Sequence, residues 1–378
     1  MPDTDFNDRT LLVTGACGVT SRTLMRALRR SPRFARTRLI GTDICDNPFA
    51  LYEGLYERIW RVPRLNEPQR YLDLVARICE RERVDAALVV PEPEVLFWAE
   101  HAMPVPALLP PPRFARLAIS KARVYDALRG TGLVPEFELL TRDAILSGAG
   151  DDWFGRGAWL RDVGDGSTSG KGALQVHNLD EARAWMTLNP ATDRFMVAQV
   201  LPGRNLACLL LYHDGQLLKT GSYERLEYFM ARTAVSGITG NICKGRLVND
   251  DAAQAVSLQA VERLCQATGE RMTGQVTVDL RADAQGRPRV TEIYLRQVAA
   301  ASAFAQVPGA NLAEALALVT LGRADLAGPR EVLFNPDNRL LRDIDGVPVY
   351  VERYRELAVG EALDARLTDL PETEGAPA

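Results

Sequence analysis

The segment GQVTVDLRADAQGRPRVTEIYLRQ, residues 274–297, has the pattern of a β-hairpin that carries acidic groups. Two strand-like runs flank the turn ADAQGRP, with Asp279 on the first run and Glu292 on the second. In a hairpin, two such acids can point to the same face and share a divalent cation. Arg296 follows Glu292 by four residues, so the two-residue period of a strand predicts the same side for it. A solvated face of alternating charges is the alternative, but the apolar and β-branched neighbours of both acids favour partial burial.

A second stretch, WLRDVGDGSTSGKG (159–172), joins the end of a strand to a glycine-rich loop. Such a loop can offer backbone N–H groups and hydroxyls to phosphate oxygens. It does not match the P-loop pattern, because a glycine follows Lys171 where serine or threonine should stand. A flexible hairpin tip would have the same composition, and an exposed loop lysine would look like Lys171. The candidate phosphate-binding residues of this loop are Gly166, Ser167, Thr168, Ser169, Gly170 and Lys171.

The first hundred residues alternate between strand and helix patterns. Buried-type strands at 10–15, 37–43 and 84–91 are separated by helical patterns at 22–31 and 68–83. This alternation predicts a parallel, Rossmann-like sheet over roughly residues 1–103. The proline-rich connector MPVPALLPPPRF (103–114) then indicates a domain boundary.

Within this region, VTGACGVTS (13–21) has the outline of a dinucleotide-binding fingerprint, with Asp43 ending the next strand. Ser21 replaces the third glycine, and no tyrosine of the chain is followed by a lysine four residues later, as a Tyr-x-x-x-Lys reductase would require. The glycines therefore fit a tight strand-to-helix turn better. An NAD(P)-dependent oxidoreductase is the least favoured reading of the chain.

Composition excludes several classes of protein. The 378 residues carry a formal net charge of −4 without a basic tract, which argues against a nucleic-acid surface. Apolar runs are too short for a membrane span, and the N-terminus does not resemble a signal peptide. The six cysteines form no C-x-x-C pair, which favours a reducing, cytoplasmic location over a disulfide or zinc framework.

The order of these features resembles the ATP-grasp superfamily, especially the branch near carbamoyl-phosphate synthetase large chains and carboxylate–amine ligases. The resemblance extends from LLVTGACG to about residue 325. In ISKARVYDALRGTGLVPEFELL (119–140), it implies that Lys121 contacts nucleotide phosphate. In AWLRDVGDGSTSGKGA (158–173), it implies a phosphate-covering lid and places Arg161 where the family has a phosphate-bridging lysine. Carbamoyl-phosphate synthetases also have arginine there, and a guanidinium can bridge two phosphate oxygens.

The segment FMVAQVLPGRNLACLLLYHDGQLL (195–218) resembles the hinge between the two lobes that hold ATP. The resemblance implies that backbone groups there bind adenine and that Asn205 replaces the glutamate that meets the ribose. The implied adenine-binding residues are Ala198, Gln199, Val200 and Leu201.

In the 274–297 hairpin, the resemblance implies that Asp279 and Glu292 bind Mg²⁺ and that Arg296 faces the reacting phosphoryl group. Tyr294 replaces the asparagine that commonly completes a second magnesium site, and tyrosine is a poor magnesium ligand. Either one Mg²⁺ is held mainly by the two acids and ATP oxygens, or the chemistry is altered or lost.

The resemblance implies an α/β protein with the ATP-grasp fold and an N-terminal Rossmann-like parallel sheet. We expect a first domain over 1–112, a small ATP-grasp lobe with the lid over 113–194, a large lobe over 195–330, and a C-terminal segment over 331–378 that packs on the core.

The implied activity is that of an ATP-dependent ligase. Such an enzyme converts a small-molecule carboxylate into an acyl phosphate, releases ADP, and joins the acyl group to an amine, here an amino acid or a derivative. The expected cofactors are ATP and Mg²⁺, and a homodimer is possible. A catalytically altered ATP-binding protein and a carbamoyl-phosphate-type enzyme are alternatives, although the latter carries two tandem ATP-grasp halves.

Substrate specificity is predicted to reside in SYERLEYFMARTAVSGITGNICKG, residues 222–245. Its charged and hydroxyl side chains could bind amino or carboxylate groups, and structural salt bridges would explain them nearly as well. The candidate substrate residues are Glu224, Arg225, Arg232 and Ser236.

Overall fold

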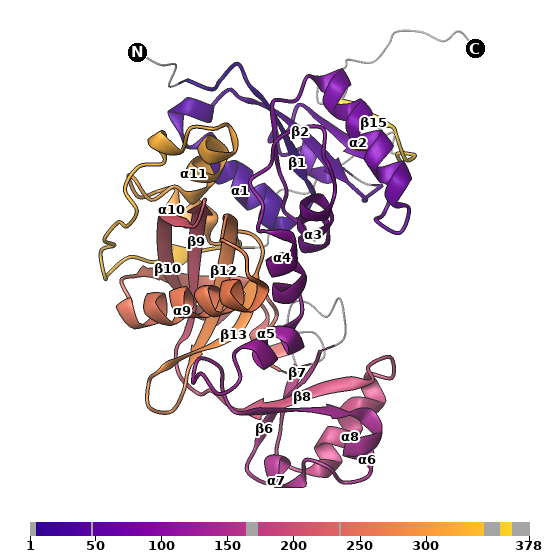
Figure 1. Cartoon of the computed structure of the whole chain (residues 1–378), viewed down its shortest axis with the longest axis vertical. Helices are drawn as coiled ribbons and strands as arrows, with labels where there is room; N and C mark the ends of the chain where they lie inside the picture. The colour runs from indigo at the N-terminus through magenta and orange to yellow at the C-terminus, as the bar shows by residue number, and fades with distance from the viewer. Residues whose placement is uncertain (1–4, 47, 164–172, 234–235, 344–355, 365–378) are drawn as a thin grey trace, which may run out of the picture.

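Three β-sheets, of five, six and four strands, follow one another along the long axis of the molecule (Figure 1). The computed structural model describes residues 5–46, 48–163, 173–233, 236–343 and 356–364. The stretch VPVYVERYREL (347–357), whose composition is typical of a strand, lies mostly outside these residues. Among the described residues, no helix is long and apolar enough to cross a membrane.

The first sheet has the predicted parallel, Rossmann-like core, with strand order β15-β3-β2-β1-β4. The parallel strands are β1 (Thr10–Thr14), β2 (Arg38–Asp43), β3 (Arg58–Arg61) and β4 (Ala86–Leu88). The helices of this part are α1 (Val19–Arg29), α2 (Pro68–Glu82) and α3 (Glu92–Glu100). Every residue of β1 is buried, as expected for a central parallel strand. A short strand near the C-terminus, β15 (Ala362–Asp364), pairs antiparallel with β3 and completes the sheet.

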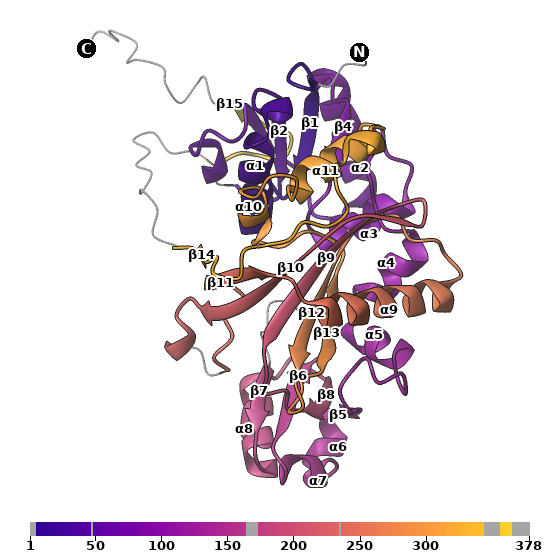
Figure 2. The same cartoon turned by 90° about the vertical axis from the view of Figure 1, so that its left-hand side faces the viewer.

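The second sheet is antiparallel, with strand order β13-β12-β9-β10-β11-β14. Its strands are β9 (Asn205–His213), β10 (Gln216–Tyr228), β11 (Ile242–Val248), β12 (Gly274–Ala282), β13 (Pro288–Tyr294) and β14 (Leu340–Leu341). The long helix α9 (Asp251–Thr268) covers one face (Figure 2). On the other side, α10 (Ala301–Phe304) and α11 (Leu312–Thr320) pack between this sheet and α1. The first and second sheets thereby share apolar contacts.

The third sheet is small and antiparallel, with strand order β5-β8-β6-β7. Its strands are β5 (Phe137–Thr141), β6 (Ala158–Asp162), β7 (Ala173–Val176) and β8 (Arg194–Gln199), with helices α6 (Arg142–Leu146), α7 (Asp151–Phe154) and α8 (Leu179–Leu188). Phe154 and Phe195 are fully buried in its own apolar core. Because β8 hydrogen-bonds to β5 and β6, this sheet extends to Gln199, past the boundary predicted at residue 194.

Two helices lead from the first sheet toward the third along the side of the second sheet (Figure 1). They are α4 (Pro112–Ala118) and α5 (Lys121–Ala127), and α5 contacts both α9 and β13. The hydroxyl of Ser120 accepts a hydrogen bond from the Arg123 amide and caps α5 at its start. The first residue of α5, Lys121, is thereby placed against the hairpin of β12 and β13.

Candidate active site

A cavity of about 380 Å³ lies between the second and third sheets and is lined by residues of both. Its walls come from α5, β6, the β8–β9 connection, β10, β12 and β13. Of the residues singled out in the sequence, it brings together Lys121, Arg161, Ala198, Gln199, Val200, Leu201, Asn205, Arg225, Asp279 and Glu292.

The two acids of the hairpin stand directly opposite each other, as the pattern predicted. Asp279 on β12 pairs with Glu292 on β13, and the register then shifts so that Leu280 pairs with Val290. Thr291 is left as the extra residue of a β-bulge, a feature that redirects side chains on a strand. Both carboxylates line the cavity.

Glu292 is held by a cation and a hydroxyl. Its Oε1 lies 2.8 Å from Nζ of Lys121, and its Oε2 accepts a hydrogen bond of 3.0 Å from the hydroxyl of Tyr294. The Lys121 and Glu292 side chains are only 11% and 16% exposed. Tyr294 stands where a magnesium-binding asparagine was expected. Its hydroxyl instead donates to Glu292, one of the two acids predicted to bind Mg²⁺.

Asp279 is paired with Arg225, at 2.6 Å between Oδ1 and Nη2. Burial raises the pKa of Asp279, while the charge of Arg225 and its hydrogen bond oppose that rise. Burial alone would lower the pKa of Arg225, but Asp279 raises it well above its usual value. The guanidinium also donates to Oδ1 of Asn205 at 2.9 Å, and the Asn205 amide donates to the Tyr228 hydroxyl at 2.8 Å. Both ends of the Asn205 side chain are therefore engaged within the protein.

Arg161 connects the third sheet to the second. Its Nη2 donates to the backbone oxygen of Thr291 at 2.7 Å, beside Glu292, and its guanidinium lies over the ring of Tyr125. Its Nε is buried and has no hydrogen-bond partner. Arg161 and Glu292 therefore lie on one side of the molecule, close enough to contact one ligand.

Arg296 does not line this cavity. Strand β13 ends at Tyr294, so strand alternation does not continue to Arg296. Its guanidinium instead donates to the hydroxyl of Thr20 on α1 at 2.9 Å. Nearby, Oε1 of Glu92 accepts a hydrogen bond from the Leu295 amide at 3.0 Å, and burial raises the pKa of Glu92. Arg296 thus lies at the junction of the first and second sheets.

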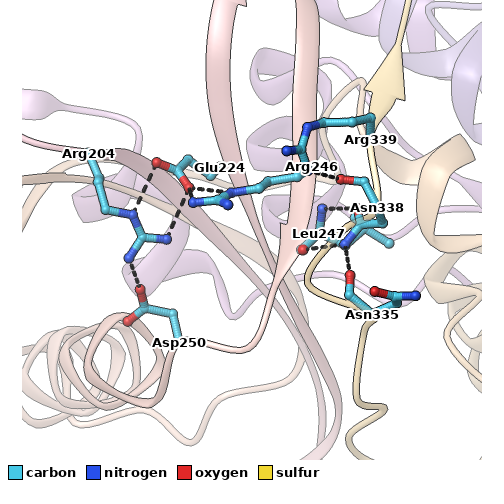
Figure 3. Close-up of polar contacts among 8 residues, drawn as sticks. All are labelled: Arg204, Glu224, Arg246, Leu247, Asp250, Asn335, Asn338 and Arg339. Carbon is cyan, nitrogen blue, oxygen red and sulfur yellow. Dashed lines mark hydrogen bonds and ion pairs between the residues drawn. The ribbon is translucent and has the colours of Figure 1, made fainter.

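A larger hollow of about 1070 Å³ adjoins the cavity and contains the predicted substrate residues Glu224, Arg225, Arg232 and Ser236 in its lining. Figure 3 shows Glu224 between Arg204 and Arg246, at 3.0 Å and 2.7 Å respectively. Arg204 also contacts Asp250, at 2.6 Å. The Glu224 carboxylate is thus satisfied by a structural salt-bridge network.

The predicted lid lies outside the described residues. Its candidate phosphate-binding residues are Gly166, Ser167, Thr168, Ser169, Gly170 and Lys171.

The cavity is also lined by side chains that the sequence did not single out, among them Tyr125, Tyr228 and Arg281. Arg281 follows Asp279 by two residues on the same strand, so strand alternation could have identified it.

The two opposed acids fit a magnesium site of a particular kind. Mg²⁺ is usually bound by one or two carboxylates together with substrate phosphates and water. Asp279 and Glu292 supply two carboxylates on one cavity wall. The described residues contain no group of three or more histidine, cysteine, aspartate or glutamate side chains that could hold a metal ion by itself. A metal at this site would therefore need ligands from the nucleotide or from water.

Comparisons with known proteins identify the fold. No family model matches the chain, and no curated protein matches its sequence. Among solved structures, an L-amino acid ligase from Bacillus licheniformis matches with a TM-score of 0.59 and 17% identity, over 83% of this chain and 74% of that one. The N5-carboxyaminoimidazole synthetase from Staphylococcus aureus, complexed with ADP, matches with a TM-score of 0.61 and 11% identity, over 90% and 82%.

The D-alanine–D-alanine ligase from Bacillus anthracis, complexed with ATP, matches with a TM-score of 0.51 and 14% identity, over 83% of this chain and 97% of that one. At these identities the likeness concerns the fold. All three are ligases of the ATP-grasp superfamily. The chain has the ATP-grasp fold, preceded by a Rossmann-like parallel sheet.

Proposed function

We propose that the protein is an ATP-dependent carboxylate–amine ligase that acts on a small-molecule carboxylate and on an amino acid or a derivative. The observation that supports this most directly is the cavity between the two antiparallel sheets, where Lys121 and Arg161 accompany the opposed acids Asp279 and Glu292. Structural neighbours solved with ADP or ATP support a nucleotide as the ligand.

The proposed reaction has two steps. A carboxylate oxygen of the substrate attacks the γ-phosphorus of ATP, the bond to the bridging oxygen of ADP breaks, and an acyl phosphate forms. The amine then attacks the acyl carbon, phosphate leaves, and the amine gives up a proton. Phosphoryl transfer of this kind depends chiefly on positioning and on neutralisation of charge.

The residues of the cavity can position the phosphates and neutralise their charge. Lys121, at the start of α5, and Arg161, on β6, are two cations of the cavity that can bind phosphate oxygens. Asp279 and Glu292 would hold Mg²⁺, which supplies further neutralisation of the phosphates when bound. Burial of these charges strengthens their interaction with the ligand, because the local dielectric constant is lower than that of water.

The hinge supplies the other end of the nucleotide site. Residues 198–201 line the cavity where β8 leaves the third sheet, and we assign their backbone groups to adenine. Asn205 lies next to them, and its amide already bridges Arg225 and Tyr228, so one lone pair on Oδ1 and one N–H of Nδ2 remain to meet a ribose hydroxyl. We assign Arg296 to the acyl-phosphate end, since it stands beside the first sheet and not among the hinge residues.

One observation favours a second candidate, a nucleotide-binding protein that no longer catalyses the reaction. The Tyr294 hydroxyl donates to Glu292 and so competes with a metal for that carboxylate. Such a protein would bind ATP but would not release ADP in response to any substrate.

A coupled ADP-release assay with ATP and Mg²⁺, run against paired panels of small carboxylic acids and amino acids, distinguishes the two candidates. The ligase predicts ADP release that needs both an acid and an amine, with amide formation seen by mass spectrometry in a one-to-one ratio to ADP. Tight ATP binding with no substrate-dependent ADP release would favour the second candidate. No binding of ATP or ADP at all would contradict both.

A further inference from the structure

Arg281 on β12 lies at the junction of the two cavities, and within the described part of the chain its guanidinium has no ion-pair partner. It lines both the 380 Å³ cavity and the adjoining hollow. Its Nε is buried without a hydrogen-bond partner, and among the described residues no ion pair to its guanidinium occurs. A guanidinium keeps its charge at any physiological pH, and a buried donor left unsatisfied carries a cost in free energy.

Three of the other cations around these cavities differ from Arg281, because each pairs with an acid. Arg225 is paired with Asp279, Arg204 with Glu224, and Lys121 with Glu292. Glu227, a further acid in the lining of the hollow, forms an exposed ion pair with Lys244. Among the described residues, no acid neutralises the charge of Arg281. The exposed Arg232, which lines the same hollow, adds a further positive charge.

The position of Arg281 lies between the hinge and the opposed acids. It follows Asp279 by two residues, which corresponds to about 7 Å along a strand. The next residue, Ala282, accepts a hydrogen bond from the Gly203 amide of the hinge at 2.9 Å. A ligand that extends from the hinge to Asp279 therefore passes the Arg281 guanidinium.

We propose that Arg281 binds an anionic group of a ligand at this junction, an inference that rests on the proposed function. The anion is a phosphate of the nucleotide or a second acidic group on the substrate in the adjoining hollow. Both sources present oxygens that a guanidinium can bind in a forked arrangement.

The test uses the full chain and three variants, Arg281→Met, Arg281→Lys and, as the matched control, Arg287→Met. Arg287 lies at the turn of the same hairpin, is 63% exposed and pairs with Asp283 away from the cavity. Calorimetric titration with ADP and with adenosine separates phosphate from base and ribose. Thermal unfolding checks that each variant is folded.

If the anion is a phosphate, Arg281→Met weakens ADP binding about tenfold or more and leaves adenosine binding within twofold. If it is an acidic group of the substrate, ADP binding is unchanged and the KM for a dicarboxylic substrate rises about tenfold, while that for a monocarboxylic one does not. In either case Arg281→Lys recovers part of the loss and Arg287→Met behaves as wild type.

Equal weakening of ADP and adenosine by Arg281→Met would show that the guanidinium contacts the base or ribose and would overturn the proposal. No change in any of these constants would overturn it as well. If the wild-type chain neither binds ADP nor turns over ATP, the proposed function itself fails, and the assignment of Arg281 falls with it.

Discussion

Asp279 and Glu292 face each other across β12 and β13, and each carboxylate contacts one cation of the chain. Asp279 pairs with Arg225 inside the second sheet, at 2.6 Å, whereas Glu292 pairs at 2.8 Å with Lys121 at the start of α5. One pair thus ties two strands of a sheet together, and the other ties the sheet to the helix that leads to the third sheet. The two acids should respond differently to substitution.

Glu292→Gln should lower the rate of ADP release at least a hundredfold, because it removes a proposed magnesium ligand and the partner of Lys121. It should also weaken nucleotide-dependent binding of Mn²⁺, measured by electron paramagnetic resonance. Asp325→Asn, at an acid that pairs with Arg323 away from the cavity, is the control. An unchanged rate in Glu292→Gln would remove the site assignment.

Arg296→Ala should lower turnover by orders of magnitude but leave the Kd for ADP within about twofold. Arg296 lies outside the cavity and contacts Thr20, so its proposed role concerns the reacting group and not nucleotide binding. Steady-state kinetics together with ADP titration give the two quantities. A parallel loss of ADP affinity would place Arg296 in the nucleotide site instead.

Arg225→Leu should destabilise the fold by about 3–5 kcal/mol, because it leaves the buried carboxylate of Asp279 without its cation. The double variant Arg225→Leu/Asp279→Leu should be more stable than Arg225→Leu, since no buried charge remains unpaired. Urea unfolding measures both. If the single and double variants lose the same stability, the pair does not behave as a buried ion pair.

Glu94 on α3 makes a further pH-dependent contribution to stability. Burial raises its pKa from 4.5 to about 7, although hydrogen bonds from Thr14 and Tyr71 oppose the rise. Below pH 4.5 the carboxyl is protonated both in the folded and in the unfolded chain, so nothing is lost. Between pH 4.5 and 7 the unfolded chain ionises first, and the folded state loses up to about 3 kcal/mol relative to it.

Glu94→Gln should abolish that part of the pH dependence. The difference in unfolding free energy between wild type and variant, measured by urea titration at several pH values, should change across pH 4.5–7 in favour of the variant as the pH rises. A difference that stays constant over this interval would mean that Glu94 titrates normally in the fold.

Gly274→Ala should destabilise the junction of β12 with the proline-rich connector by about 2 kcal/mol or more. Gly274 has φ of +87°, and an added Cβ would lie 2.5 Å from backbone atoms of Leu109 and Pro110. Gly286→Ala is the matched control, because its φ is +78° and no atom lies within 4 Å of its added Cβ. Equal losses in both variants would indicate that backbone strain, and not the close approach, sets the cost.

Local patterns predicted much of the architecture. The alternation of strands and helices predicted the parallel first sheet, and the paired runs around ADAQGRP predicted the hairpin that sets Asp279 opposite Glu292. Both features follow from the periodicity of apolar residues and from turn residues, and these signals lie within short segments of the sequence. The α/β class and the ATP-grasp fold, which the family resemblance implied, were confirmed by the solved structures that the chain matches.

Features that depend on contacts between distant segments were harder to predict. Residues 195–199 of β8 were assigned to the large lobe, but β8 pairs with β5 and β6, and no local signal shows which sheet an apolar strand will join. Arg225 was taken as a substrate residue, and only the fold reveals that it is paired with Asp279. Glu224 likewise contacts Arg204 and Arg246, from two other parts of the chain.

The short strand β15 makes the first sheet depend on a segment that lies about 300 residues later in the chain. It pairs with β3, and Asp364 contacts Arg58 at 2.5 Å. A fragment that stops before residue 362 would leave β3 as an unprotected edge, open to pairing with a second molecule. Dissection of this protein into separately expressed halves should therefore yield an aggregating N-terminal piece unless a peptide that spans residues 356–364 is supplied in trans.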